Sequence, residues 1–132
     1  MTDVLDQQEK ETLQTAAYGA VMLVSVAYPR VVATARTNIV GAKVLSSATG
    51  LVGEVLSAKL EAKLPKGTNA EVADVILPAL RDAVAILERR APAEVENYRR
   101  TVRLAVERGV GSEPEPVVAD MVAKVEGALA GS

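Results

Sequence analysis

Residues 12–29, TLQTAAYGAVMLVSVAYP, decide the fold, because eighteen consecutive positions carry no charged side chain. Apolar residues recur there every three or four positions, which is the spacing of one helix face: Leu13, Ala17, Ala20, Val24 and Ala27. The stretch also contains threonine, glutamine and serine and is rich in alanine, whereas membrane insertion favours leucine, isoleucine, phenylalanine and valine. We therefore expect a helix buried at the centre of the fold rather than a membrane span.

Both ends of this helix are marked by local signals. Asp6 and Glu9 have the spacing of a capping box, in which two side chains satisfy free backbone N–H groups of the first turn. Pro29 ends the pattern, because its ring removes a hydrogen-bond donor that a continuing helix needs. The residues before the apolar run are acidic, the reverse of the basic start of a signal peptide. We therefore expect a cytoplasmic protein.

The middle of the chain predicts three further helices. The second is expected over residues 30–47, and Ser47 or Thr49 can cap a third that extends through Leu64. A capping box at residues 68–71 then precedes a fourth apolar face made of Val72, Ile76, Leu80, Ala83 and Leu87. Pro78 lies inside this last pattern, so the helix is expected either to kink there or to divide in two.

The last third of the chain predicts two more helices. Pro92 is suited to the first turn of one helix, and its apolar stripe ends before the glycines of residues 109–111. A capping box at residues 112–115 precedes a final helix that carries Val118, Val125 and Leu129. No stretch alternates with a period of two, so no sheet is expected. We predict one all-α domain over residues 1–132, a compact bundle of five to seven helices with a buried central N-terminal helix.

The composition restricts both the core and the chemistry. The chain has 132 residues, no phenylalanine or tryptophan and three tyrosines, so the core must be built from aliphatic side chains. Histidine and cysteine are absent, which removes serine–histidine and cysteine–histidine catalysis and the usual zinc sites. The formal net charge of −2 argues against a general binder of nucleic acid. We expect no enzyme, no cofactor and no metal centre.

Two acid pairs nevertheless need weighing as sites for a hard cation. Glu94 and Glu96 begin one predicted helix, and Glu113 and Glu115 begin the last. Oxygen ligands suit Mg²⁺ or Ca²⁺, but the sequence contains no calcium-loop spacing. Acidic residues are also favoured at the N-termini of helices by the helix dipole. We adopt this second interpretation.

A stripe of short side chains is the first candidate for a binding surface. Its members lie four positions apart in the second predicted helix and would let another helix come close: Thr34, Asn38, Ala42 and Ser46. The region that contains them, residues 12–53, has no acidic residue and only Arg30, Arg36 and Lys43 as charges. We expect this stripe to form an interface with a second copy of the chain or with another protein.

A cluster of arginines within residues 89–108 is the second candidate. Arg99, Arg100 and Arg103 could contact an anion, a nucleic-acid backbone or an acidic partner. The competing interpretation is a solvated helix face, because glutamates lie four positions from Arg100 and Arg103 at the spacing of ordinary surface pairs. We favour the solvated face and retain the partner contact as an alternative.

Residues 101–129 form a helix, a turn at Gly109-Val110-Gly111-Ser112, an acid at Glu115 and a closing helix. This arrangement resembles half of the all-helical domain of tellurite-resistance (TerB-like) proteins, over about a third of the chain. That family usually carries an acid before the glycine of the turn, associated with metal binding, whereas Arg108 stands here and Tyr28-Pro29 replaces the other turn. The resemblance therefore implies a helical accessory domain without the metal function.

Our leading hypothesis is a non-enzymatic helical domain for protein interaction or self-association. Limited burial per chain motivates it, since small aliphatic side chains gain less from burial than aromatic ones. A carrier or sensor that holds a small ligand between helices, anchored by an arginine or a tyrosine, is the second hypothesis. Weak association with nucleic acid through residues 89–108 is the third.

Overall fold

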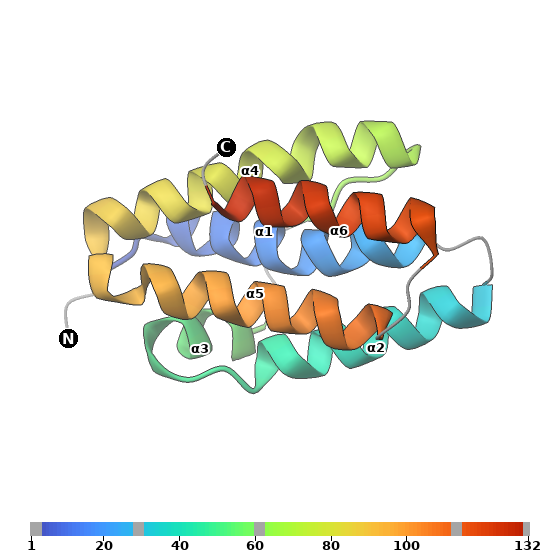
Figure 1. Ribbon diagram of the computed structural model, residues 1–132. Coiled ribbons are helices and arrows are strands. Elements are labelled where there is room, and N and C mark those ends of the chain that lie inside the picture. Colours follow the sequence, from blue (N-terminus) through green and yellow to red (C-terminus); the bar gives the residue numbers. More distant parts are fainter. Residues whose placement is uncertain (1–3, 28–30, 60–62, 112–114, 131–132) are drawn as a thin grey trace.

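The computed structural model describes residues 4–27, 31–59, 63–111 and 115–130, with side chains omitted for residues 31–37. Over these residues the chain forms six α-helices, one 3₁₀ turn and no strand, which confirms the predicted all-α bundle (Figure 1). The elements are α1 (Gln7–Val26), α2 (Val31–Ser46), α3 (Gly50–Ser57), α4 (Asn69–Arg90), the turn η1 (Pro92–Glu94), α5 (Val95–Val110) and α6 (Pro116–Leu129).

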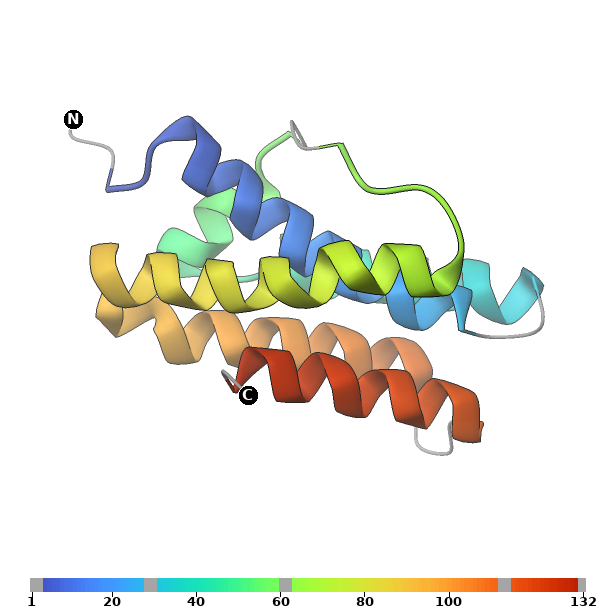
Figure 2. The same ribbon diagram turned by 90° about the horizontal axis from the view of Figure 1, so that it is seen from above.

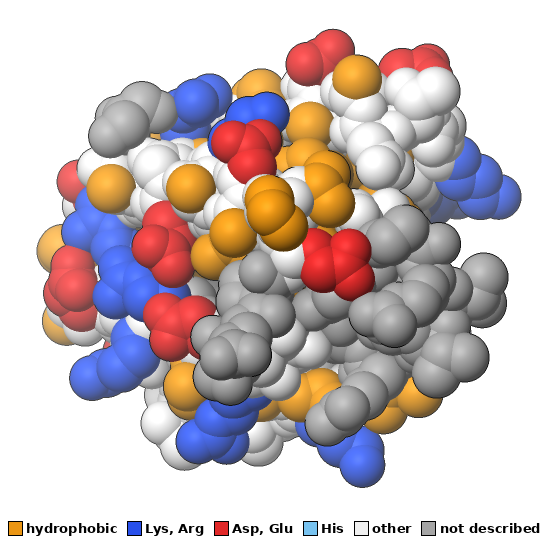
Figure 3. All heavy atoms as spheres, turned by 45° about the vertical axis from the view of Figure 1, so that its right-hand side comes forward, with side chains coloured by type: hydrophobic (Ala, Val, Ile, Leu, Met, Phe, Trp, Pro, Cys, Tyr) orange, Lys and Arg blue, Asp and Glu red, His pale blue; other side chains and the backbone are white. Residues whose placement is uncertain are grey.

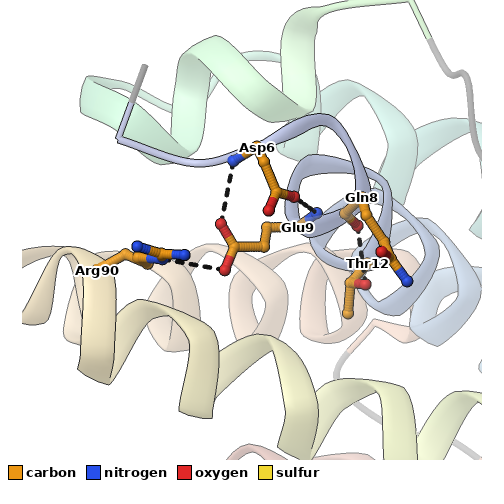
Figure 4. Close-up of polar contacts among 5 residues, drawn as sticks. All are labelled: Asp6, Gln8, Glu9, Thr12 and Arg90. Atoms are coloured by element: carbon orange, nitrogen blue, oxygen red, sulfur yellow. Dashed lines mark hydrogen bonds and ion pairs between the residues drawn. The ribbon is translucent and has the colours of Figure 1, made fainter. Parts of the chain in front are cut away.

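The predicted capping box at the start of α1 is present (Figure 4). The backbone N–H of Glu9 donates to Asp6 Oδ1 at 2.8 Å, and that of Asp6 donates to Glu9 Oε1 at 3.0 Å. Arg90 Nε donates to the second carboxylate oxygen of Glu9 at 3.1 Å. These bonds lower the pKa of the Glu9 carboxyl, chiefly through the backbone of Asp6. They also join the N-terminus of α1 to the C-terminus of α4.

Helix α1 is the buried centre of the bundle, as the charge-free sequence from Thr12 onward predicts. It contacts each of the other α-helices of the described chain, and Figures 1 and 2 show it lying between α4 and the α2–α5 pair. Every member of the predicted apolar face is buried: Leu13, Ala17, Ala20, Val24 and Ala27. Full burial of a leucine or valine side chain contributes about 1.5–3 kcal/mol, so α1 supplies much of the hydrophobic stabilisation.

Among the described residues, the fully buried core is aliphatic apart from Tyr98, as the composition predicts. This residue of α5 is completely buried, and its hydroxyl donates to the carbonyl oxygen of Leu13 in α1 at 2.8 Å. Burial raises the pKa of the Tyr98 phenol well above its ordinary value. The buried hydroxyl of Ser25 donates to the carbonyl of Val21 at 2.7 Å. These two buried hydroxyl groups therefore donate to main-chain carbonyls of α1, so neither donor is left unpaired in the core.

The prediction that the third helix extends through Leu64 is wrong. Helix α3 ends at Ser57, and Ala58 has extended backbone angles, φ −71° and ψ 161°. The physical cause lies in α1, whose side chains bind the last carbonyls of α3. Gln14 Nε2 donates to the carbonyls of Val55 at 3.0 Å and of Lys59 at 3.2 Å. Tyr18 likewise donates its hydroxyl to Leu56 at 2.5 Å, so these carbonyls are satisfied without a further helical turn.

Helix α4 continues through Pro78 as a single helix, which decides between the two alternatives that the sequence left open. Its predicted capping box is present: the N–H of Glu71 donates to Thr68 Oγ1 at 3.2 Å, and that of Thr68 donates to Glu71 Oε1 at 3.0 Å. Asn69 Nδ2 donates to the last carbonyl of α1, that of Val26, at 3.3 Å. All members of the predicted α4 face are buried: Val72, Ile76, Leu80, Ala83 and Leu87.

The residues that begin and end α5 are those that the sequence predicts, but the predicted start of α6 needs a correction. Pro92 opens the η1 turn before α5, and Gly111, with φ 81°, ends α5 in a conformation that favours glycine. The predicted capping box at residues 112–115 does not start α6, because the helix begins at Pro116 with Glu115 as its N-cap and no side-chain capping bond. Proline at the first position suits a helix start, since its missing N–H would be unpaired there. Residues 112–114 lie outside the described residues.

Helix α2 approaches two other helices closely at Gly41. A Cβ atom at this position would lie 2.5 Å from Cγ1 of Val21 in α1 and 3.3 Å from the carbonyl oxygen of Ala105 in α5. Both distances are shorter than ordinary van der Waals contacts, so the hydrogen atom of glycine lets three helices meet at one point.

Two glycine substitutions should therefore change stability in opposite directions. Gly41→Ala overpacks a junction of three helices, and we expect the free energy of unfolding to fall by about 1–3 kcal/mol. Gly127→Ala places its Cβ where nothing in the described chain lies within 4 Å, so the better helix propensity of alanine should raise stability by about 0.5–1 kcal/mol. Urea unfolding of both variants checks the pair, and equal shifts would contradict the packing at Gly41.

The two capping boxes predict how the thermal stability of the fold decreases in acid. The pKa of Glu71, like that of Glu9, is lowered from 4.5 chiefly by a bond from a backbone N–H group. Such carboxylates contribute stability that is fully present above the unfolded pKa and is lost as the pH falls through the folded pKa. Below about pH 4.5 we expect the Tm to fall more steeply than in a Glu9→Gln/Glu71→Gln variant, whose amides do not titrate. Thermal unfolding followed by circular dichroism across this range measures the difference, and parallel curves would argue against it.

Candidate interaction surface on α2 and α5

Helices α2 and α5 lie side by side and run in opposite directions (Figure 1). Together they border a surface hollow of about 330 Å³, which we call the α2–α5 groove. One side is formed by the end of α2 and the residues that follow it: Val44, Ser47, Ala48 and Thr49. The other side is formed by α5: Asn97, Arg100, Thr101, Leu104 and Arg108. This lining contains two arginines and no acidic residue.

Three residues of α5 give the groove its chemical character. Arg100, Leu104 and Arg108 follow one another at steps of four positions, so each lies beside the next on the surface of α5. Both arginines are exposed and form no hydrogen bond or ion pair with another described residue, and Leu104 is 37% exposed between them. The face thus offers guanidinium donors on both sides of an aliphatic side chain. The regular spacing was visible in the sequence, but no sequence feature indicated that Leu104 would remain exposed.

Hydrogen bonds hold the end of the groove in place. Asn97 Nδ2 of α5 donates to the carbonyl of Thr49 at 2.9 Å. Glu94 Oε1 accepts from the backbone N–H of Val52 at 3.1 Å, at the N-terminus of α3, where the helix dipole favours a negative charge. The connection from α2 to α3 is thereby attached to the start of α5. This acid does occupy a helix N-terminus, but the helix is α3 and not the one that Glu94 precedes in sequence.

The remaining predicted acids do not assemble a site in the described part of the chain. Glu96 pairs with Arg99 at 2.7 Å, Glu115 is the N-cap of α6, and Glu113 lies outside the described residues. Among the residues that the structure describes, no three acidic side chains come together in a way that could hold a metal ion.

The structure separates the three predicted arginines. Arg99 donates from Nε to the carbonyl of Leu129, at the end of α6, at 2.7 Å, and from Nη1 to Glu96 at 2.7 Å. It therefore stabilises the C-terminus of α6, where a cation is favoured. Arg100 lines the α2–α5 groove, whereas Arg103 is exposed on α5 outside it. The expected pairing of Glu96 with Arg100 is wrong, because Glu96 pairs one position earlier.

The predicted stripe on α2 lies mostly at the surface. Asn38 and Ser46 are exposed, Ala42 is partly buried, and the side chain of Thr34 lies outside the described residues. Residues four apart advance by about 40° around a helix of 3.6 residues per turn, so a stripe at this spacing turns away from any one neighbour. Within the described chain, the tight helix contact is made by Gly41 instead. An interface at the stripe with a second molecule stays a prediction.

Large hydrophobic side chains remain exposed on several helices. Ile39 of α2 has the greatest exposed fraction among those described, 58%, followed by Val117 of α6 at 54% and Val75 of α4 at 48%. On the face drawn in Figure 3, hydrophobic side chains gather in the upper middle and are bordered by acidic and basic ones. Acids lie close in sequence to both valines, whereas α2 contains no acid. Of these three side chains, Ile39 is thus the most exposed and the one whose helix contains no acidic residue.

Comparisons of the chain with models of known protein families, with curated proteins and with solved structures find no match. The resemblance to TerB-like domains therefore stays a prediction. No helix in the described part of the chain combines enough length with enough hydrophobicity to span a membrane.

Because Arg99 and Arg103 make different contacts, we expect their replacement to affect the free energy of unfolding differently. Arg99→Ala should lower the free energy of unfolding by about 1–3 kcal/mol, because it removes charge-assisted bonds to the end of α6 and to Glu96. Arg103→Ala changes the same charge on an exposed side chain and should stay within about 0.5 kcal/mol of the unaltered protein. Urea unfolding measures both. A loss in Arg103→Ala as large as that in Arg99→Ala would show that net charge, rather than the α6 contact, is responsible.

Proposed function

We propose that the chain is a non-enzymatic self-association domain in which the exposed face of α2 packs against α2 of a second copy. The observation that carries this proposal is the 58% exposure of Ile39 on a helix with no acidic residue. Its exposed or half-buried neighbours on the helix, Asn38, Ala42 and Ser46, are short and would allow a second helix to approach. Burial of Ile39 in each copy would contribute about 1.5–3 kcal/mol per side chain.

The other exposed hydrophobic residues support an interface less well. Val75 directly follows Asp74, and Val117 lies between Glu115 and Asp120 on the first turns of α6. Burial of either valine would bring a carboxylate near the interface, where loss of water penalises an unpaired charge. The outer face of α2 carries one described charge, Lys43, whose long side chain can extend to water from the edge of a contact.

The chemistry of the chain favours association over catalysis or ligand carriage. The lack of histidine and cysteine removes the most common general base and nucleophile. A ligand carrier anchored by a tyrosine is disfavoured, because Tyr18 and Tyr98 already donate their hydroxyl hydrogens to main-chain carbonyls. Nucleic-acid binding is disfavoured by the net charge of −2.

Light scattering coupled to size exclusion tests the proposal over a range of protein concentrations. We expect a concentration-dependent increase in mass that Ile39→Ser abolishes, because the variant removes the hydrophobic contact without touching the core. Salt should strengthen the association, since it screens repulsion between the Lys43 side chains and does not weaken hydrophobic burial.

Val75→Ser and Val117→Ser are the matched controls, because each also removes an exposed aliphatic side chain. Both should associate like the unaltered protein. A strict monomer at millimolar concentration, or association that is lost in a control and kept in Ile39→Ser, would refute an interface on α2.

A further inference from the structure

We propose that the α2–α5 groove is a docking site for an acidic peptide segment of another protein, a segment that contains an aliphatic residue between two carboxylates. This inference goes beyond self-association and rests on a different surface, since Ile39 does not line the groove. It starts from the exposed arginines Arg100 and Arg108, which have no partner among the described residues, and from Leu104 between them.

The lining of the groove matches such a segment chemically. Guanidinium groups form paired, charge-assisted hydrogen bonds with carboxylates, and the absence of acid from the lining leaves both arginines available for a partner. Leu104 and Val44 add apolar side chains to the lining, which also includes Ser47 and Thr49. A volume of about 330 Å³ falls within the range of pockets that enclose small groups.

The spacing of the arginines sets the geometry of the partner. Arg100 and Arg108 are eight positions apart on one helix, which corresponds to about 12 Å along its axis. In an extended peptide that advances about 3.3 Å per residue, carboxylates three or four positions apart would span this distance. The aliphatic residue would then lie between them and opposite Leu104.

An acidic peptide fits the groove better than a nucleic acid does. Nucleic-acid affinity comes from many phosphate contacts along a basic track, whereas this groove has two arginines on a protein of net charge −2. Its lining contains no aromatic side chain on which a base could stack. A charged phosphate backbone would also gain nothing from the exposed aliphatic side chain of Leu104, which lies between the two arginines.

A random library of twelve-residue peptides, selected against the full chain at low salt, tests the proposal. We expect the enriched sequences to contain two acidic residues three or four positions apart with an aliphatic residue between them. The best peptide, followed by fluorescence anisotropy, should bind at least tenfold more weakly to Arg100→Ala/Arg108→Ala and to Leu104→Ser. Its binding should weaken as salt rises, opposite to the salt effect expected for self-association.

Arg89→Ala/Arg103→Ala is the matched control, because it removes two exposed arginines outside the groove and changes the net charge equally. It should bind the peptide within twofold of the unaltered protein. Circular dichroism confirms that each variant is folded. Enrichment without acidic residues, equal loss in the control, or preference for a single-stranded oligonucleotide over the selected peptide would overturn the proposal.

The failure of this proposal can be told apart from failure of the self-association. Ile39→Ser should keep peptide binding, and Arg100→Ala/Arg108→Ala should keep the concentration-dependent mass. Loss of peptide binding in Ile39→Ser would overturn the assignment to the groove, because that side chain is not part of its lining.

Discussion

The absence of charge from α1 after its first turns, from Thr12 onward, is the constraint on which the rest of the structure depends. Because no charged side chain interrupts residues 12–29, most of this helix cannot face water without a large hydrophobic cost. The chain meets the constraint by placing the other α-helices against α1. Small side chains make this arrangement possible, and they include Gly19, which packs against Ile76 of α4, and Ala20. Helices that approach so closely need no aromatic side chains to fill the space between them.

The polar groups of α1 organise its neighbours as much as the apolar ones do. Helix α3 has eight residues, which is too short for a helix to be stable alone in water. Gln14 and Tyr18 bind the carbonyls at its C-terminus, and Glu94 binds an N–H group near its N-terminus. The same Glu94–Asn97 segment fixes one end of the α2–α5 groove. The short helix and the candidate binding surface are thus held by connected bonds.

Local signals made much of the fold predictable. The capping boxes at Asp6 and Thr68 and the apolar faces of α1, α4 and α5 depend on residues within a few positions of one another, so a single sequence reveals them. The end of α3 was not predictable, because the groups that terminate it lie about forty positions away in sequence. The role of Gly41 was missed for the same reason.

The candidate site was predictable only in part. The sequence shows that Arg100, Leu104 and Arg108 follow one another at steps of four residues along one helix, but which arginines are used within the fold depends on where α6 ends. Arg99 binds a carbonyl at the end of α6, whereas Arg100 and Arg103 do not. The exposure of Ile39 and Leu104 also follows from the arrangement of α2 and α5, since apolar periodicity alone assigns such residues to a core.

The buried phenol of Tyr98 links the loss of stability at high pH to the opening of the core. Its pKa is raised by burial alone, and its hydroxyl hydrogen is held by a carbonyl of the central helix. A group of this kind contributes stability that is complete below its unfolded pKa and declines as the pH rises above that value. Ionisation of this side chain therefore requires water to reach the middle of the bundle. In a chain without tryptophan, the part of the tyrosinate absorbance that comes from Tyr98, as distinct from Tyr18 and Tyr28, marks the separation of α1 and α5.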